Sequence, residues 1–278
     1  MQRLPILLTN DDGINSPGLQ RLASSLHSLG HPIVILAPLT EQSAVGMKLT
    51  LRDDMAFEEH TDIAEKIRTD DSVPLRVFSL DGSPCDCVIV AIDGGLRSWA
   101  PEIRPWLCIS GINRGPNLSV DVLHSGTVSA AREASLYGLP SLSVSLATYS
   151  HQDYSQSIEA TLALVERLSE LITVDPINIL RPEGSRTRPI EGTGPNSLRS
   201  WFMQGNMFLN LNIPENWNGT FQTVPLGARW YRSATDMIDK KSMGVAFEVG
   251  AAKIVDEEIE MTDCHAIASG SASITPMA

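Results

Sequence analysis

Cysteine is scarce in this sequence, and its spacing excludes the common zinc sites. None of the four cysteines belongs to a CxxC motif, and the two nearest form a CxC. Structural zinc sites usually need two such close pairs. We therefore expect reduced thiols, mostly in the core, and a cytoplasmic protein. The four residues are Cys85, Cys87, Cys108 and Cys264.

Long apolar runs are also missing. No segment approaches the roughly 20 apolar residues that are needed to span a bilayer. The apolar run before Asp11 and Asp12 is too short for a secretory signal peptide. We therefore expect no membrane association and no export.

Positive charge is in deficit, since the formal net charge is -12 at pH 7. This balance argues against electrostatic capture of DNA or of an anionic membrane over the whole surface. A small phosphate pocket is compatible with it, because such a pocket needs oriented donors more than net charge. We therefore expect no DNA partner.

The composition is that of a soluble globular protein. The chain has 278 residues, of which 42% are apolar and 19% are charged, enough for one large domain or two modest ones. Its first half alternates short apolar runs with helical periodicity, which predicts an α/β fold with a mostly parallel sheet and helices on both faces. The expected strands are Leu4–Thr9, Ile33–Ala37, Trp106–Ser110 and Ser141–Ala147, and the expected helices begin at Ser16, Ser83, Ser125 and Gln156.

The pattern changes after residue 180. The segment 181–197 is rich in Pro, Gly, Ser and Arg, which predicts a loop. Met207–Pro214 alternates as a strand, and short strand-like pieces follow from Thr220 onward. We therefore divide the chain into a catalytic core at 1–180 and a β-rich region at 181–278. Unpaired strand edges need partners, so we expect a homodimer or tetramer in which Thr220–Lys253 reaches a neighbouring subunit.

Polar residues follow three of the expected strands. Asp11 and Asp12 follow the first, Ser43 follows the second, and Asn113 follows the strand at Trp106. Parallel strands bring such segments to one edge of the sheet. Two carboxylates, a hydroxyl and an amide oxygen suit a hard cation such as Mg²⁺ or Mn²⁺. The alternative is an ordinary turn, because Asn, Asp and Gly all favour turns.

A second feature is expected beside this set. Ser125, Gly126 and Thr127 begin a helix, where free N–H groups and the helix dipole favour an anion. An ordinary capped helix is the alternative for this segment alone. A cation site and an anion site at one edge together indicate phosphate chemistry.

Three segments resemble the survival protein SurE family of metal-dependent nucleotidases. They read ILLTNDDGINSPGLQRLASSL, SGINRGPNLSVDVLHSGTVSAAREASLYGLPSLSVSL and TDCHAIASGSASITP. The resemblance implies a Rossmann-like core with a C-terminal oligomerisation region. It also implies hydrolysis of phosphomonoesters by a metal-activated water, with nucleoside monophosphates as typical substrates of a 5′/3′-nucleotidase.

The resemblance also implies a set of site residues. It implies one divalent metal ion per subunit, Mg²⁺ or Mn²⁺, and a catalytic role for Asp11, Asp12 and Asn113. The expected metal ligands are Asp11, Asp12, Ser43 and Asn113, and the expected phosphate-binding residues are Asn10, Asn117, Ser125, Gly126 and Thr127.

The chain departs from the family pattern at several positions. Leu39 and Gln42 stand where the family more usually carries an Asp and an Arg. The usual aromatic-rich segment before the last acidic stretch reads SMGVAFEVG, and the closing element reads GSASITP. These changes bear on base preference and oligomer packing, whereas the expected metal ligands are all present.

Two other functions fit parts of the pattern. The first is a phosphatase of the haloacid dehalogenase type with an aspartyl-phosphate intermediate. Such enzymes carry Asp-x-Asp, whereas Asp11 and Asp12 are adjacent. The second is a non-enzymatic module that binds nucleotide and uses the metal as a bridge. Turnover of a phosphomonoester separates this module from an enzyme.

Overall fold

The computed structural model describes residues 3–172, 195–240, 244–250 and 252–278. The loop predicted at 181–197 lies outside these residues up to position 194, and its last three positions are not loop, because they begin the helix α7 (Pro195–Met203). None of the described helices combines the length and the apolar character needed to cross a membrane.

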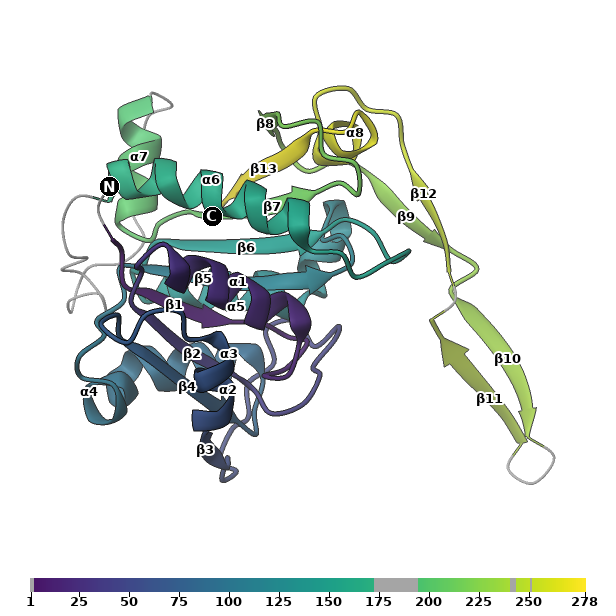
Figure 1. Cartoon of the computed structure of the whole chain (residues 1–278). Helices are drawn as coiled ribbons and strands as arrows, with labels where there is room; N and C mark the ends of the chain where they lie inside the picture. Colours follow the sequence, from purple (N-terminus) through teal and green to yellow (C-terminus); the bar gives the residue numbers. More distant parts are fainter. Residues whose placement is uncertain (1–2, 173–194, 241–243, 251) are drawn as a thin grey trace.

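A mostly parallel sheet forms the centre of the molecule, as the sequence predicts (Figure 1). Among the described residues it has nine strands, in the order β3-β4-β2-β1-β5-β6-β7-β13-β8. Strand β3 pairs antiparallel with β4, and β13 pairs antiparallel with β7. The strands are β1 (Ile6–Thr9), β2 (Ile33–Pro38), β3 (Phe57–Glu59), β4 (Leu75–Leu80), β5 (Leu107–Arg114), β6 (Ser141–Leu146), β7 (Phe208–Ile213), β8 (Phe221–Thr223) and β13 (Ala272–Met277).

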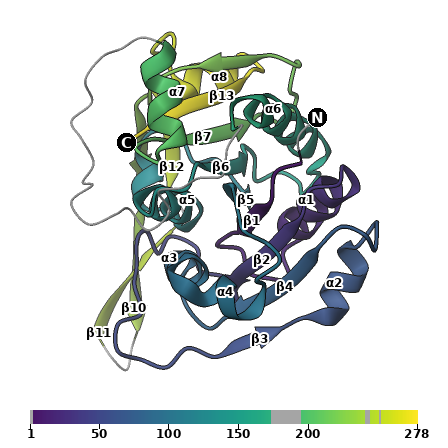
Figure 2. The ribbon, with the colours of Figure 1, turned by 90° about the vertical axis from the view of Figure 1, so that its left-hand side faces the viewer.

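Helices cover both faces of this sheet (Figure 2). Side chains alternate between the faces along β1, since Ile6 and Leu8 pack in a core with Leu19 of α1, whereas Leu7 packs in a second core with Val88 of α3. The helical elements are α1 (Pro17–Ser28), α2 (Thr61–Ile67), α3 (Pro84–Val90), the π-helical turn η1 (Ala91–Gly95), α4 (Leu96–Trp99), the 3-10 turn η2 (Ser119–Leu123), α5 (Gly126–Leu136), α6 (Ser155–Leu171), α7 (Pro195–Met203) and α8 (Asp263–Ala268).

Three of the four predicted helix starts are confirmed by capping bonds, whereas the helix expected from Gln156 begins at Ser155 without a side-chain cap. Ser16 caps α1 by accepting a hydrogen bond from the Leu19 N–H, and Pro17 occupies the first turn. Ser83 and Asp86 form a capping box at the start of α3. The third cap, Ser125, accepts from the Val128 N–H at 3.0 Å and starts α5, which packs against β5 and β6.

Strand β5 is longer than the sequence predicts. The expected strand ended at Ser110, but pairing with β6 resumes at Asn113 after a shift in register. The polar side chain of Asn113 therefore lies on the strand itself rather than in a loop behind it. The β-bulge between Ser110 and Asn113 allows this extension, because the strand resumes its pairing with β6 after the irregular residues.

Two antiparallel ribbons extend away from the sheet on the C-terminal side of the chain (Figure 1). Strand β9 (Arg229–Arg232) pairs with β12 (Lys253–Asp256), and β10 (Thr235–Lys240) pairs with β11 (Gly244–Val249). We call these four strands the arm. They are among the short strands expected after Thr220, whereas α8, capped by Thr262, was not predicted.

Candidate active site

The loops after β1 and β2 and the end of β5 meet at one edge of the sheet. Strand β1 lies between β2 and β5 and runs parallel to both. The Gln42 N–H donates to the Asp11 carbonyl at 2.7 Å. The Arg114 N–H donates to Oδ2 of Asp12 at 3.3 Å. The predicted convergence of three polar segments is therefore confirmed.

Asp11 is held by the first turn of α5. Its carboxylate accepts the Thr127 N–H at 3.0 Å and also the Thr127 hydroxyl. A Cβ on Gly126 would lie 2.8 Å from the Cβ of Asp11, so only glycine allows this approach. The anion at this helix N-terminus is thus the Asp11 side chain. Burial raises the pKa of Asp11, while these hydrogen bonds act in the opposite direction.

Asp12 lies beside this buried carboxylate and is more exposed. Burial, followed by repulsion from Asp11, raises the pKa of Asp12 from 3.8 to about 7. A hydrogen bond from the Arg114 N–H lowers it, and the carboxylate of Glu41 raises it further. Two neighbouring carboxylates with raised pKa values form a site where a cation would offset the repulsion.

The other two expected metal ligands come from the adjacent segments. The Ser43 hydroxyl donates to Oε1 of Glu41 at 2.7 Å. The side-chain N–H of Asn113 donates to the Gly115 carbonyl at 2.9 Å, which turns the amide so that its oxygen is the end left for a cation. The four residues expected to bind metal thus lie on segments that are joined by hydrogen bonds.

Asn10 and Asn117 have different surroundings. The Asn10 side chain donates to Gly13 and Ser16, and its buried Oδ1 has no hydrogen-bond partner among the described residues. Asn117 is buried, donates to Ser145 on β6, and exchanges further bonds with β7. Asn10 therefore keeps an acceptor beside Asp11, whereas the bonds of Asn117 tie its loop to the sheet.

The sequence reasoning missed one carboxylate at this edge. Glu41 acts electrostatically on Asp12 and accepts the Ser43 hydroxyl. Its only signal in the sequence is its position two residues before Ser43, in the loop that follows β2. That signal does not separate it from the many exposed glutamates of an acidic chain.

The residues at this edge fit a hard divalent cation. Two carboxylates, a hydroxyl and an amide oxygen form an all-oxygen set. In the described part of the chain, no three His, Cys, Asp or Glu side chains gather in a way that could hold a metal. The orphaned Oδ1 of Asn10 adds a polar oxygen beside the expected metal ligands.

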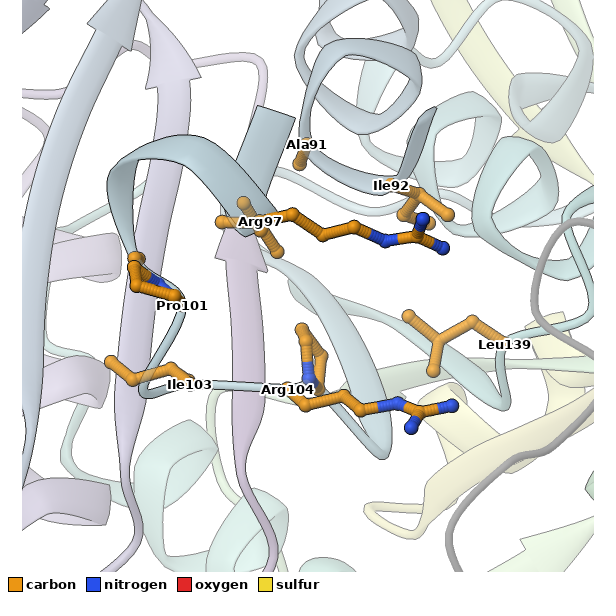
Figure 3. Close-up of a pocket in the computed structure, with 10 residues that line it drawn as sticks. Ala91, Ile92, Arg97, Pro101, Ile103, Arg104 and Leu139 are labelled. Atoms are coloured by element: carbon orange, nitrogen blue, oxygen red, sulfur yellow. The ribbon is translucent and has the colours of Figure 1, made fainter. Parts of the chain in front are cut away.

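A separate cavity of about 340 Å³ lies at the opposite end of the sheet (Figure 3). It is bordered by Ile103 and Leu139, which precede β5 and β6, so it faces away from the edge that carries Asp11. Arg97 and Arg104 extend in the same direction from opposite sides of this cavity. None of the residues expected at the metal site lines it.

The chain is similar to proteins of one family over nearly its whole length. The model of the family described as survival protein SurE matches residues 6–236. A relative from Synechococcus sp. (strain JA-3-3Ab) named 5′-nucleotidase SurE is 34% identical, over 98% of this chain and 90% of that protein. A relative of the same name from Syntrophotalea carbinolica is 35% identical, with the same coverage of each chain.

A solved structure agrees with the fold. The SurE protein from Aquifex aeolicus superposes with a TM-score of 0.66 and is 27% identical. The match covers 98% of this chain and 92% of that one. From the matched sequence, the shared sheet and the carboxylate pair at its edge, we conclude that this chain belongs to the SurE family.

Proposed function

We propose that the protein is a metal-dependent 5′-nucleotidase that hydrolyses nucleoside monophosphates to nucleoside and phosphate. The observation that carries this proposal is the pair of adjacent carboxylates, Asp11 and Asp12, whose pKa values are both raised at the edge where three polar segments meet. The names of the relatives support the choice of substrate. Activity toward 3′-monophosphates is part of the same proposal.

One divalent ion per subunit, Mg²⁺ or Mn²⁺, would be held by Asp11, Asp12, Ser43 and Asn113. Such an ion polarises phosphoryl oxygens and lowers the pKa of a bound water when it is present. The chain itself orients the ligands. Thr127 fixes both oxygens of Asp11, and the Gly115 carbonyl fixes the amide of Asn113.

The two aspartates have different roles in this proposal. Asp11 is almost fully buried and both of its oxygens already accept hydrogen bonds from Thr127. Asp12 has one oxygen bonded to Arg114, which leaves its other oxygen to orient the attacking water and accept its proton. In this proposal Asn10, Ser125, Gly126 and Thr127 would lie near the bound phosphate, although the Thr127 donors are taken by the Asp11 carboxylate and not by the phosphate itself.

The hydrogen bonds of Asp11 also weigh against the aspartyl-phosphate alternative. A nucleophilic carboxylate needs an accessible oxygen with a free path to phosphorus. Asp11 is only 3% exposed, and Asp12 is not spaced as the second residue of an Asp-x-Asp pair. Direct attack by water therefore agrees better with this geometry than covalent catalysis does.

We also propose that the arm joins two subunits into a homodimer, which can pair further into a tetramer. The arm extends away from the body of the molecule (Figure 1). Apolar side chains on and beside it are exposed, and Val249 and Met261 are exposed by 75% and 73%. Exposed apolar surface of this kind is typical of an interface.

The four free and buried cysteines support the predicted cytoplasmic location.

A substrate panel tests the proposed function. Purified protein with added Mn²⁺ is incubated with nucleoside 5′- and 3′-monophosphates, a sugar phosphate and p-nitrophenyl phosphate, and phosphate release is measured. We expect the nucleotides to give the highest kcat/KM. A protein that binds nucleotides but releases no phosphate from any of them would instead be the non-enzymatic module.

A further inference from the structure

A buried arginine joins the base of the arm to the turn beside the active site. Arg229 begins β9 and is only 6% exposed. Its Nη1 donates to Oδ2 of Asp121 at 2.8 Å, and its Nε and Nη2 donate to the two oxygens of Asp256 at 2.7 and 2.8 Å. Its backbone N–H donates to Ser119 Oγ at 3.0 Å. One residue of the arm therefore binds η2 and β12 together.

Asp121, the residue of η2 that the Arg229 side chain binds, also forms hydrogen bonds with the residues on both sides of η2. Besides Arg229, its carboxylate accepts the Tyr231 hydroxyl at 2.5 Å and the Leu118 N–H at 3.2 Å. Its backbone carbonyl accepts the Ser125 N–H at 3.0 Å. Asp121 thus fixes the residue that follows Asn117 and the residue that caps α5.

This series of hydrogen bonds, from Arg229 through Asp121 to Ser125, ends at the first turn of α5. Ser125 caps the helix through the Val128 N–H, and the next two residues contact Asp11. Gly126 leaves no room for an added Cβ against Asp11, so the helix and the carboxylate fit closely. A small shift of Ser125 therefore changes where the Asp11 oxygens lie.

Arg229 forms ion pairs with Asp121 and Asp256. Loss of Arg229 is expected to cause such a shift of Ser125. Asp121 is 7% exposed, and Arg229 is its cationic partner in this cluster. A buried carboxylate that loses its partner is costly unless it gains water. Because Asp121 lies on a short 3-10 turn, the turn can move outward to hydrate it, and Ser125 would move with it.

We propose that Arg229 and Tyr231, at the base of the arm, are positioning residues that hold Asp11 in place through Asp121 and the cap of α5. The proposal rests on the proposed function only in that Asp11 binds a metal ion. In this proposal the geometry of the metal site depends on how the base of the arm packs against η2. Neither residue contacts Asp11 directly.

The test compares three variants with the wild-type full chain. Arg229→Ala removes the cation, Arg229→Lys keeps the charge but not the forked donors, and Tyr231→Phe removes a single hydroxyl from a half-exposed ring. Arg232→Ala is the matched control, because Arg232 is exposed on the same strand and packs on Trp230 instead of a carboxylate. The affinity for Mn²⁺ is measured by calorimetry on metal-free protein, and near-UV circular dichroism checks the fold.

We expect Arg229→Ala to bind Mn²⁺ about 10- to 100-fold more weakly, as is typical when a residue that orients a metal ligand is lost. Arg229→Lys should restore part of the affinity, Tyr231→Phe should lose less, and Arg232→Ala should match the wild type. If Arg229→Ala does not fold, Tyr231→Phe carries the test alone. Folded Arg229→Ala or Tyr231→Phe with wild-type Mn²⁺ affinity would overturn the proposal.

The same measurements separate this proposal from the proposed function. A wild-type protein that binds Mn²⁺ but hydrolyses no nucleotide would refute the nucleotidase assignment, while the order of Mn²⁺ affinities among the variants would still test the role of Arg229. With an active enzyme, Arg229→Ala should also raise KM, and addition of saturating Mn²⁺ should reduce this effect.

Discussion

Substitution of Asp12 by Asn should stabilise the metal-free protein while weakening its hold on metal. The two aspartates repel each other at a partly buried edge, and the pKa of Asp12 is raised to about 7. Asn keeps nearly the same volume and removes one negative charge. The metal-free variant should therefore be more stable than the wild type at neutral pH, although it has lost a functional carboxylate.

The size and the sign of this change in the free energy of unfolding follow from the pKa of Asp12. A rise from 3.8 to about 7 corresponds to about 4 kcal/mol, at about 1.36 kcal/mol for each pKa unit, and this is an upper bound because water screens the exposed part of the carboxylate. Between these pH values the folded state binds more protons than the unfolded chain, so the contribution of Asp12 to stability falls as the pH rises. We expect Asp12→Asn to gain up to about 2 kcal/mol at pH 5 and up to about 4 kcal/mol at pH 8.

Urea denaturation in EDTA, at pH 5 and at pH 8, measures this gain. Asp53→Asn is the control, since Asp53 is exposed and is not one of the expected metal or phosphate ligands. Calorimetry with Mn²⁺ gives the second half of the prediction, a weaker binding constant for Asp12→Asn. The reasoning is refuted if the variant is less stable than the wild type at pH 8 in EDTA, or if its gain does not grow with pH.

Three further predictions concern the site and the assembly. Gly126→Ala should weaken Mn²⁺ binding, because the added Cβ would lie 2.8 Å from the Cβ of Asp11; calorimetry measures it, and unchanged affinity would contradict the packing argument. Hydrolysis in ¹⁸O-labelled water should place the heavy oxygen in phosphate, and acid quenching should leave no labelled protein; stable label on Asp11 would support the aspartyl-phosphate route instead. Light scattering of the full chain should give a dimer or tetramer, and a monomer at micromolar concentration would show that the arm does not join subunits.

Local signals in the sequence predict the part of the fold that carries the site. Ser16 with Pro17, and Ser125 with Gly126, mark helix starts that depend only on neighbouring residues. The apolar run that ends at Thr9 marks a buried strand, and the parallel arrangement then brings Asp11, Asp12 and the loop after β2 together. These features need no information from distant parts of the chain.

Other features depend on contacts between distant residues and could not be read in this way. Strand β4 has no clear local signal in the sequence, because Arg76 and Ser79 interrupt its apolar run, and it becomes recognisable only through its parallel pairing with β2. Strand β13 joins the sheet through β7, far back in the chain. The bond from Arg229 to Asp121 spans 108 residues, and neither residue carries a local signal for it.

The use of the α5 N-terminus illustrates the same limit at the site. The sequence indicates that Ser125 to Thr127 can bind an anion, and a phosphate is the obvious candidate in a phosphatase. In the structure, the Thr127 N–H and the Thr127 hydroxyl both donate to the carboxylate of Asp11. Helix geometry predicts that an anion is present, but only the packing of the first turn of α5 against Asp11, in the loop after β1, identifies which anion it is.

Phosphate release from a nucleoside monophosphate, followed through removal and return of metal, tests the central claim most directly. The wild type should release phosphate with Mn²⁺, stop in excess EDTA, and recover when Mn²⁺ or Mg²⁺ is restored. Asp12→Asn, folded and stable in the same buffer, should remain slow throughout. Full activity of the wild type in EDTA, with no metal in the purified protein, would contradict the assignment of Asp11 and Asp12 to a metal site.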